Sequence, residues 1–149
     1  MKRRLAALGG VLVVLMVFVL AARGARSAGP PAVRFRTVDV YIESSRPLAA
    51  YQVAIRVESG DATFLSVEGG EQPFAEPPYY DPAAQGDARI VLAALDSQRT
   101  LPVGRHRVAT LHVREAGVAR YDIELVAAAA ADAKRVAAHA ELESPKEAP

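Results

Sequence analysis

The chain has 149 residues, no cysteine and no tryptophan, and its 18 basic and 17 acidic side chains nearly cancel. Without cysteines the folded part has no disulfides, so packing and strand pairing must supply its stability. Beyond residue 26 the chain has 13 basic and 17 acidic residues, and it contains no basic cluster with interleaved aromatic residues. The resulting net charge near −4 excludes nucleic acid as an expected partner.

The first 29 residues have the layout of an export signal: three basic residues, an apolar run over residues 5–22, and then small residues. As a helix, the run would be about 27 Å long, close to the ~30 Å of a bilayer core, which favours a retained anchor. Ala22-Arg23-Gly24 and Ala25-Arg26-Ser27, however, resemble cleavage sites. We expect residues 1–29 to be a signal peptide or an N-terminal membrane anchor. The rest should be exported, either membrane-anchored or secreted/periplasmic.

Beyond this segment, short stretches alternate between apolar and polar residues, which is the pattern of half-buried strands. They are separated by turn clusters such as Ser59–Asp61 and Gly69–Gly70. The alternating stretches are residues 38–43, 51–58, 63–67, 109–114 and 121–126. A continuous apolar run over residues 88–95 is typical of a central strand covered on both faces.

The alanine-rich stretch 126–142 is ambiguous, because alanine has the best helix propensity. A lone helix would leave the sheet with an unpaired edge, so we favour a closing hairpin that turns at residues 131–134. The pattern as a whole predicts an all-β domain, an antiparallel β-sandwich, over residues 30–142. Residues 143–149 should form a disordered tail. The large side chains expected in the core are Tyr51, Val53, Ile55, Leu92, Leu111, Val113, Ile123 and Leu125.

Three stretches in this order carry a family resemblance. Residues 47–55 (PLAAYQVAI) resemble a strand of cohesin-type domains, and residues 90–95 (IVLAAL) and 101–113 are similar to later strands of that family. The resemblance covers roughly residues 38–125. It implies a jelly-roll sandwich of the carbohydrate-binding-module superfold, exported and displayed at the cell surface, that binds dockerin modules. The proline-rich insert at residues 71–82 departs from the family pattern.

That insert holds the most distinctive local sequence. Phe74, Tyr79 and Tyr80, together with Asp81, are candidate binding residues, because aromatic side chains bury much area at little entropy cost. The alternative is that two of the rings fold back as a plug over one end of the core, since proline-rich loops have few backbone donors to anchor them.

Metal and catalytic interpretations are weaker. The insert and its flanks carry Glu68, Glu71, Glu76, Asp81 and Asp87, oxygen donors that suit calcium, but their spacing fits no EF-hand. His106, His112 and His139 lie on separate segments without ligand spacing. There is no cysteine, no Gly-x-Ser-x-Gly elbow and no phosphate-binding glycine loop. The sequence therefore predicts no enzyme, no cofactor and no metal site.

Two functions remain. The first is an exported, non-catalytic interaction module that binds a protein partner, dockerin-like or another envelope protein, and contacts the membrane through residues 5–22 if these are uncleaved. The alternative is a carbohydrate-binding module that uses the aromatic loop at residues 74–82. The absence of tryptophan favours the first, because flat glycan-binding platforms lean heavily on that side chain.

Overall fold

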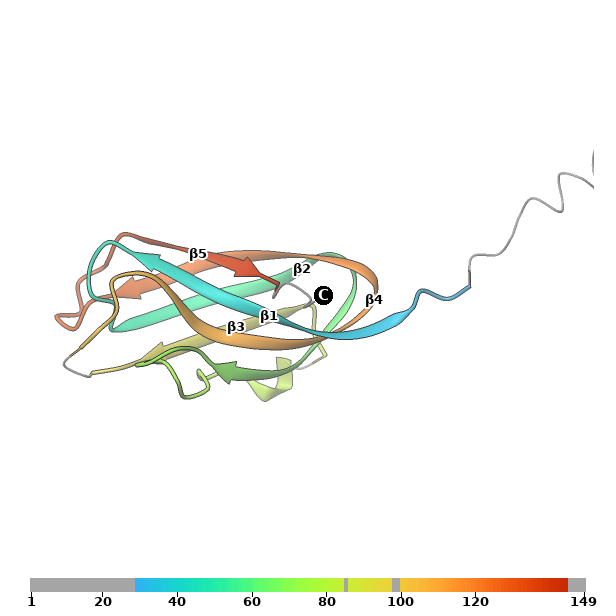
Figure 1. The fold of residues 1–149 in the computed structure, drawn as a ribbon, viewed down its shortest axis with the longest axis horizontal. Coiled ribbons are helices and arrows are strands. Elements are labelled where there is room, and N and C mark those ends of the chain that lie inside the picture. The colour runs from blue at the N-terminus through green and yellow to red at the C-terminus, as the bar shows by residue number, and fades with distance from the viewer. Residues whose placement is uncertain (1–28, 85, 98–99, 145–149) are drawn as a thin grey trace, which may run out of the picture. The chain divides into compact units, whose positions relative to one another are not determined.

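The computed structural model describes residues 29–84, 86–97 and 100–144. The predicted signal or anchor segment and the end of the tail lie outside these ranges. The described residues form the strands β1 (Val33–Ser44), β2 (Ala50–Gly69), β3 (Arg89–Leu95), β4 (Gly104–Ala129) and β5 (Ala138–Glu143), which are labelled in Figure 1. One 3₁₀ turn, η1 (Pro82–Ala84), precedes β3, and the described ranges hold no α-helix. No helix in this part of the chain is therefore long and apolar enough to cross a membrane.

All five strands form one antiparallel sheet in the order β3-β2-β4-β1-β5. The first part of β4 lies between β1 and residues 61–69 of β2. Its last part, residues 120–129, pairs with residues 50–59 of β2, and residues 50–56 of β2 pair in turn with β3. The predicted all-β, antiparallel class is therefore confirmed.

The sheet folds back over itself, because β2 and β4 both bend near their middle. Gly60 and Gly117 mark these bends with φ values of 89° and 82°, a backbone region that glycine adopts without strain. One core cluster joins side chains of β1 and β3, although these strands are not neighbours in the sheet. The Tyr51 hydroxyl also donates to the carbonyl of Val108 at 3.1 Å, while its ladder partner is Ala128. Two halves of the sheet thus enclose one core.

The bends correct one expectation about the strands. Ser59–Asp61 was predicted to be a turn between separate strands, but it lies inside β2, and the stretches 109–114 and 121–126 are likewise one strand, β4. The physical reason is that a glycine with positive φ, together with shifts of register, redirects a strand while pairing resumes on either side.

The position of β3 corrects a second expectation. This strand was predicted to be central and covered on both faces, but it lies at one end of the sheet order, and Leu95 is 78% exposed. Its inward side chains, Ile90 and Leu92, are buried as expected. The apolar side chains on its other face, such as Val91, are only partly covered.

Most of the predicted core is buried. Tyr51, Val53, Ile55, Leu92, Leu111 and Val113 are each at most 3% exposed. Ile123 and Leu125 pack against the core but are only partly buried. The reason is that this part of β4 is paired with β2 on one side and, in the described residues, with no strand on the other. Inward side chains at such an edge are covered less completely.

Within the alanine-rich stretch 126–142 the chain turns at residues 131–133 and forms no helix, as predicted, but the predicted closing hairpin is wrong in the partner of its last strand. The amide of Ala130 donates to the carbonyl of Lys134 at 2.9 Å, and Ala129 forms an antiparallel bridge with Arg135. The chain then leaves β4, and β5 pairs with β1 instead of completing a hairpin with the strand before it.

Candidate functional site

The proline-rich insert is anchored closely to the core. Phe74 is 3% exposed, and its ring meets the Tyr51 ring edge-on with centroids 5.2 Å apart. The amide of Gly70 donates to the carbonyl of Phe74 at 2.7 Å. A Cβ atom at Gly69 would lie 2.0 Å from the carbonyl oxygen of Ala75, so this glycine permits the close approach of the loop.

The four predicted binding residues do not form one surface. Phe74 is buried, and Tyr80 is partly buried against the core cluster. The Asp81 carboxylate is exposed but accepts a hydrogen bond from the amide of Ala83 at 2.9 Å, which stabilises the turn at η1. Tyr79, in contrast, is 77% exposed. A binding role for these residues stays a prediction, and Tyr79 is the member whose ring is available to a partner.

Backbone pairing places Tyr79 on the outer face of the sheet. Its amide donates to the carbonyl of Ala93 at 2.8 Å, and the amide of Ala93 donates back at 2.9 Å. Directly paired residues of an antiparallel ladder point to the same face. Because Ile90 and Leu92 point inward, Ala93 and therefore Tyr79 point outward.

Most outward positions around Tyr79 are small or apolar, and we call this surface the alanine face. It comprises Tyr79, Val91, Ala93 and Leu95 beside Ala50 of β2 and Val126, Ala127 and Ala129 of β4, with the polar Gln52 among them. Ala54, at the next outward position of β2, is 1% exposed and contributes no surface. Outward faces of antiparallel sheets normally carry polar residues. Here alanines form a flat floor, above which Tyr79 and Leu95 stand largely exposed. This arrangement can bury apolar area against a flat partner.

The opposite end of the same sheet half is charged. The Arg56 guanidinium donates to the Asp122 carboxylate at 2.8 Å, and both side chains are about half exposed. This hydrogen bond and the charge of Asp122 raise the pKa of Arg56. The ion pair therefore marks a solvated border of the alanine face.

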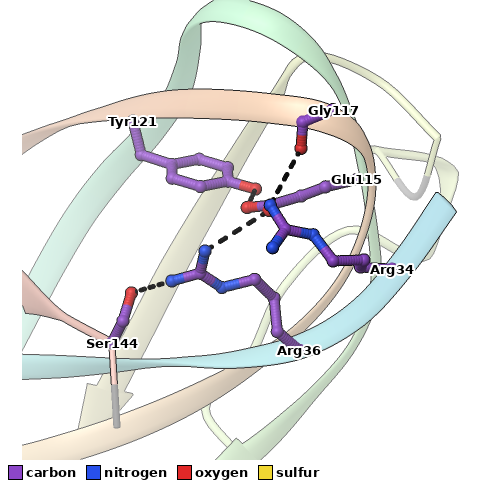
Figure 2. Close-up of polar contacts among 6 residues, drawn as sticks. All are labelled: Arg34, Arg36, Glu115, Gly117, Tyr121 and Ser144. Atoms are coloured by element: carbon purple, nitrogen blue, oxygen red, sulfur yellow. Dashed lines mark hydrogen bonds and ion pairs between the residues drawn. The ribbon is translucent and has the colours of Figure 1, made fainter. Parts of the chain in front are cut away.

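Sequence reasoning missed a buried acid at the open end between the two halves of the sheet. Glu115 is fully buried, and Figure 2 shows Tyr121 and Arg36 directed toward its carboxylate. The Tyr121 hydroxyl donates to Oε1 at 2.6 Å, and Nη1 of Arg36 lies 3.4 Å from Oε2. Burial first, and then the hydrogen bond to Glu115, raise the pKa of Tyr121. The pairing satisfies the carboxylate, so its first role is structural.

The three histidines lie apart from one another, and each contacts a different part of the chain. His106 contacts the carbonyl of Gln72 at 2.6 Å, and His112 Nε2 lies 2.9 Å from the Glu68 carboxylate. His139 lies on β5, 3.9 Å from Glu43. Within the described residues, no three histidine, aspartate or glutamate side chains lie where they could hold one metal ion.

The comparisons with known proteins give no match: no family model, no curated protein and no solved structure resembles the chain closely enough to be reported.

Proposed function

We propose that this chain is a non-catalytic interaction module, presented outside the cytoplasmic membrane, that binds a protein partner through the alanine face. The observation that carries the proposal is the outer face of β3, where Val91 and Ala93 are only partly covered and Leu95 is 78% exposed. Exposed apolar patches of this kind mark interaction sites. Export rests on the charged and apolar pattern of residues 1–29.

We also propose the finer fold, a jelly-roll β-sandwich of the cohesin-like type. Its support is that two halves of one sheet enclose a single core, together with the resemblance of residues 47–55, 90–95 and 101–113 to cohesin strands. A dockerin-like module or another envelope protein is the kind of partner that this resemblance implies.

The test introduces a charge on the proposed surface. The full chain, solubilised in mild detergent, is used to capture partners from an envelope extract. It is compared with Leu95→Arg and with Val103→Arg, which changes an exposed valine in the loop before β4 that is not part of the alanine face. The wild type and Val103→Arg should retain the same protein, whereas Leu95→Arg should lose it without a change in unfolding midpoint. Equal capture by both variants would contradict the assignment of this face.

Carbohydrate binding is the second candidate, and the exposed ring of Tyr79 is the observation that favours it. A single exposed ring can stack on the face of a sugar, whereas a protein partner would also contact the alanines and Leu95 around it. Affinity electrophoresis in gels containing polysaccharide separates the two functions. Retardation that is lost in Tyr79→Ala and kept in Leu95→Arg would favour the carbohydrate module over the protein-binding module.

A further inference from the structure

The first half of β1 is an unpaired sheet edge in the part of the chain that the structure describes. Residues 33–38 pair with β4 on one side, whereas β5 pairs only with residues 39–44 on the other. Figure 1 shows β1, in blue, continuing past the tip of the β5 arrow, in red. Six residues at ~3.3 Å each give an edge of about 20 Å, the length of an ordinary strand.

The side chains along this edge alternate between apolar and basic residues. Val33 and Phe35 point to the outer face, and Phe35 is 72% exposed. Arg34 and Arg36 point to the other face, at the open end of the core (Figure 2). Arg36 is engaged by Glu115 and by the Ser144 hydroxyl. The guanidinium of Arg34 instead donates to the carbonyl of Gly117 at 3.3 Å, and among the described residues it pairs with no carboxylate.

A depression of about 310 Å³ opens beside the same edge. It is lined by the ends of β1 and β5 and by β4 residues, with Arg36, Leu142 and Ser144 next to the edge. Arg120 and Glu58 line its far side and oppose each other in charge. A strand added along residues 33–38 would direct every second side chain toward this depression.

Two other strand edges within the described residues are less suited to strand addition. The edge of β3 is capped at Ala93 by the backbone of Tyr79. The last part of β4 presents Arg120, Asp122 and Glu124 outward, and charged side chains discourage pairing with further strands. Within the described part of the chain, residues 33–38 combine backbone groups without a strand partner, an exposed phenyl ring and an arginine without a carboxylate partner.

We propose that β1 residues 33–38 bind an extended peptide segment of a partner protein by strand addition, and that this segment alternates acidic and apolar residues. Backbone hydrogen bonds to the edge supply affinity, and the alternate side chains supply specificity. An acidic side chain of the peptide pairs with Arg34, and an apolar one packs on Phe35. This surface is separate from the alanine face, so neither proposal depends on the other.

The test measures amide hydrogen exchange of the full chain in detergent, with synthetic peptides as probes. One peptide has the sequence Val-Glu-Ile-Glu-Val-Thr, and its control has lysine at both glutamate positions. The acidic peptide is added at a concentration that occupies nine-tenths of the sites. The backbone amides of residues 33–38 that point to the free edge should then exchange about tenfold more slowly, because only the unoccupied tenth of the molecules exchanges. The lysine peptide should have no such effect.

Two variants make the result decisive. Arg34→Glu should lose the protection by the acidic peptide and gain it from the lysine peptide, whereas Leu95→Arg on the alanine face should behave like the wild type. Absence of protection by either peptide, or protection that Arg34→Glu leaves unchanged, would overturn the proposal. A third result would also overturn the proposal. If these amides are already protected in the wild type without peptide, and lose that protection in a chain that ends at Ser144, the chain's own tail occupies the edge.

Discussion

Replacing Arg36 by methionine tests whether burial, rather than distance, decides what an ion pair contributes to this fold. The change keeps an unbranched apolar stem but leaves the buried Glu115 carboxylate without its cation. Breaking a buried ion pair from one side costs about 3–5 kcal/mol. Here the arginine is 37% exposed, and the Tyr121 hydroxyl still donates to the carboxylate. We therefore expect a loss of about 2–3 kcal/mol in unfolding free energy, at or just below the lower end of that range.

The assay is urea unfolding followed by circular dichroism, with Arg56→Met as the matched control. The Arg56–Asp122 pair is shorter, 2.8 Å against 3.4 Å, but it is half exposed on both sides. Its loss should barely move the midpoint, since exposed pairs contribute little. Adding Glu115→Gln to Arg36→Met should restore much of the stability, because the buried group is then neutral. Equal midpoints for the two single variants, or a further loss in the double variant, would refute this reasoning.

Three further outcomes are expected in the same unfolding assay. Gly60→Ala should destabilise the domain more than Gly86→Ala. Both glycines have positive φ, but a Cβ atom added at Gly60 would lie 2.5 Å from a carbonyl oxygen, whereas one added at Gly86 would meet nothing within 4 Å. Leu92→Ala should cost about 2–5 kcal/mol because it opens a cavity, whereas Leu95→Ala at an exposed position should cost almost nothing; similar losses at the two sites would contradict the assigned core. Burial raises the pKa of Tyr51 above its ordinary 10.0, so the stability that this group contributes is complete below pH 10.0 and declines as the pH rises beyond it. Midpoints measured between pH 9 and 11 should fall less steeply in Tyr51→Phe, and an unchanged slope would exclude this tyrosine as a cause.

Local alternation was sufficient to predict the fold class, because period-2 patterns directly report which face of a strand is buried. Tyr51, Val53 and Ile55 were assigned to the core correctly for that reason. The same pattern could not distinguish two strands from one bent strand. At Gly60 the turn-like sequence produces a bend, and whether pairing continues beyond it depends on residues far away in β4.

The position of β3 and the buried acid depended on pairing between distant segments, which a single sequence does not display. The apolar run at residues 88–95 was compatible with a central strand, and only the sheet order shows it to be an edge. Arg36 and Glu115 did leave a signal in the sequence. Each is a charged residue at a position where the alternation of its strand calls for an apolar, inward-facing one, and the two charges are opposite. Recognising them as partners requires the register between β1 and β4.

The sequence singled out the aromatic loop, whose binding role stays a prediction, but it did not show which of the rings in that loop are buried. Burial of Phe74 depends on its contact with Tyr51, and exposure of Tyr79 depends on its pairing with Ala93. Both contacts join the insert to strands elsewhere in the chain, so composition alone could not separate the anchored ring from the exposed one.

The long strands shared by both halves of the sheet have a consequence for how fast the domain acquires its structure. Paired strands lie far apart in the sequence. β1 ends at Ser44, but its partner β4 begins at Gly104, and residues 50–59 of β2 can pair only when residues 120–129 are present. Closing such wide chain loops costs entropy before any pairing energy is gained, and domains dominated by distant contacts fold slowly. We therefore expect the domain to fold only once the chain is complete to residue 129. If the chain is exported, as proposed above, this delay would keep it unfolded during translocation.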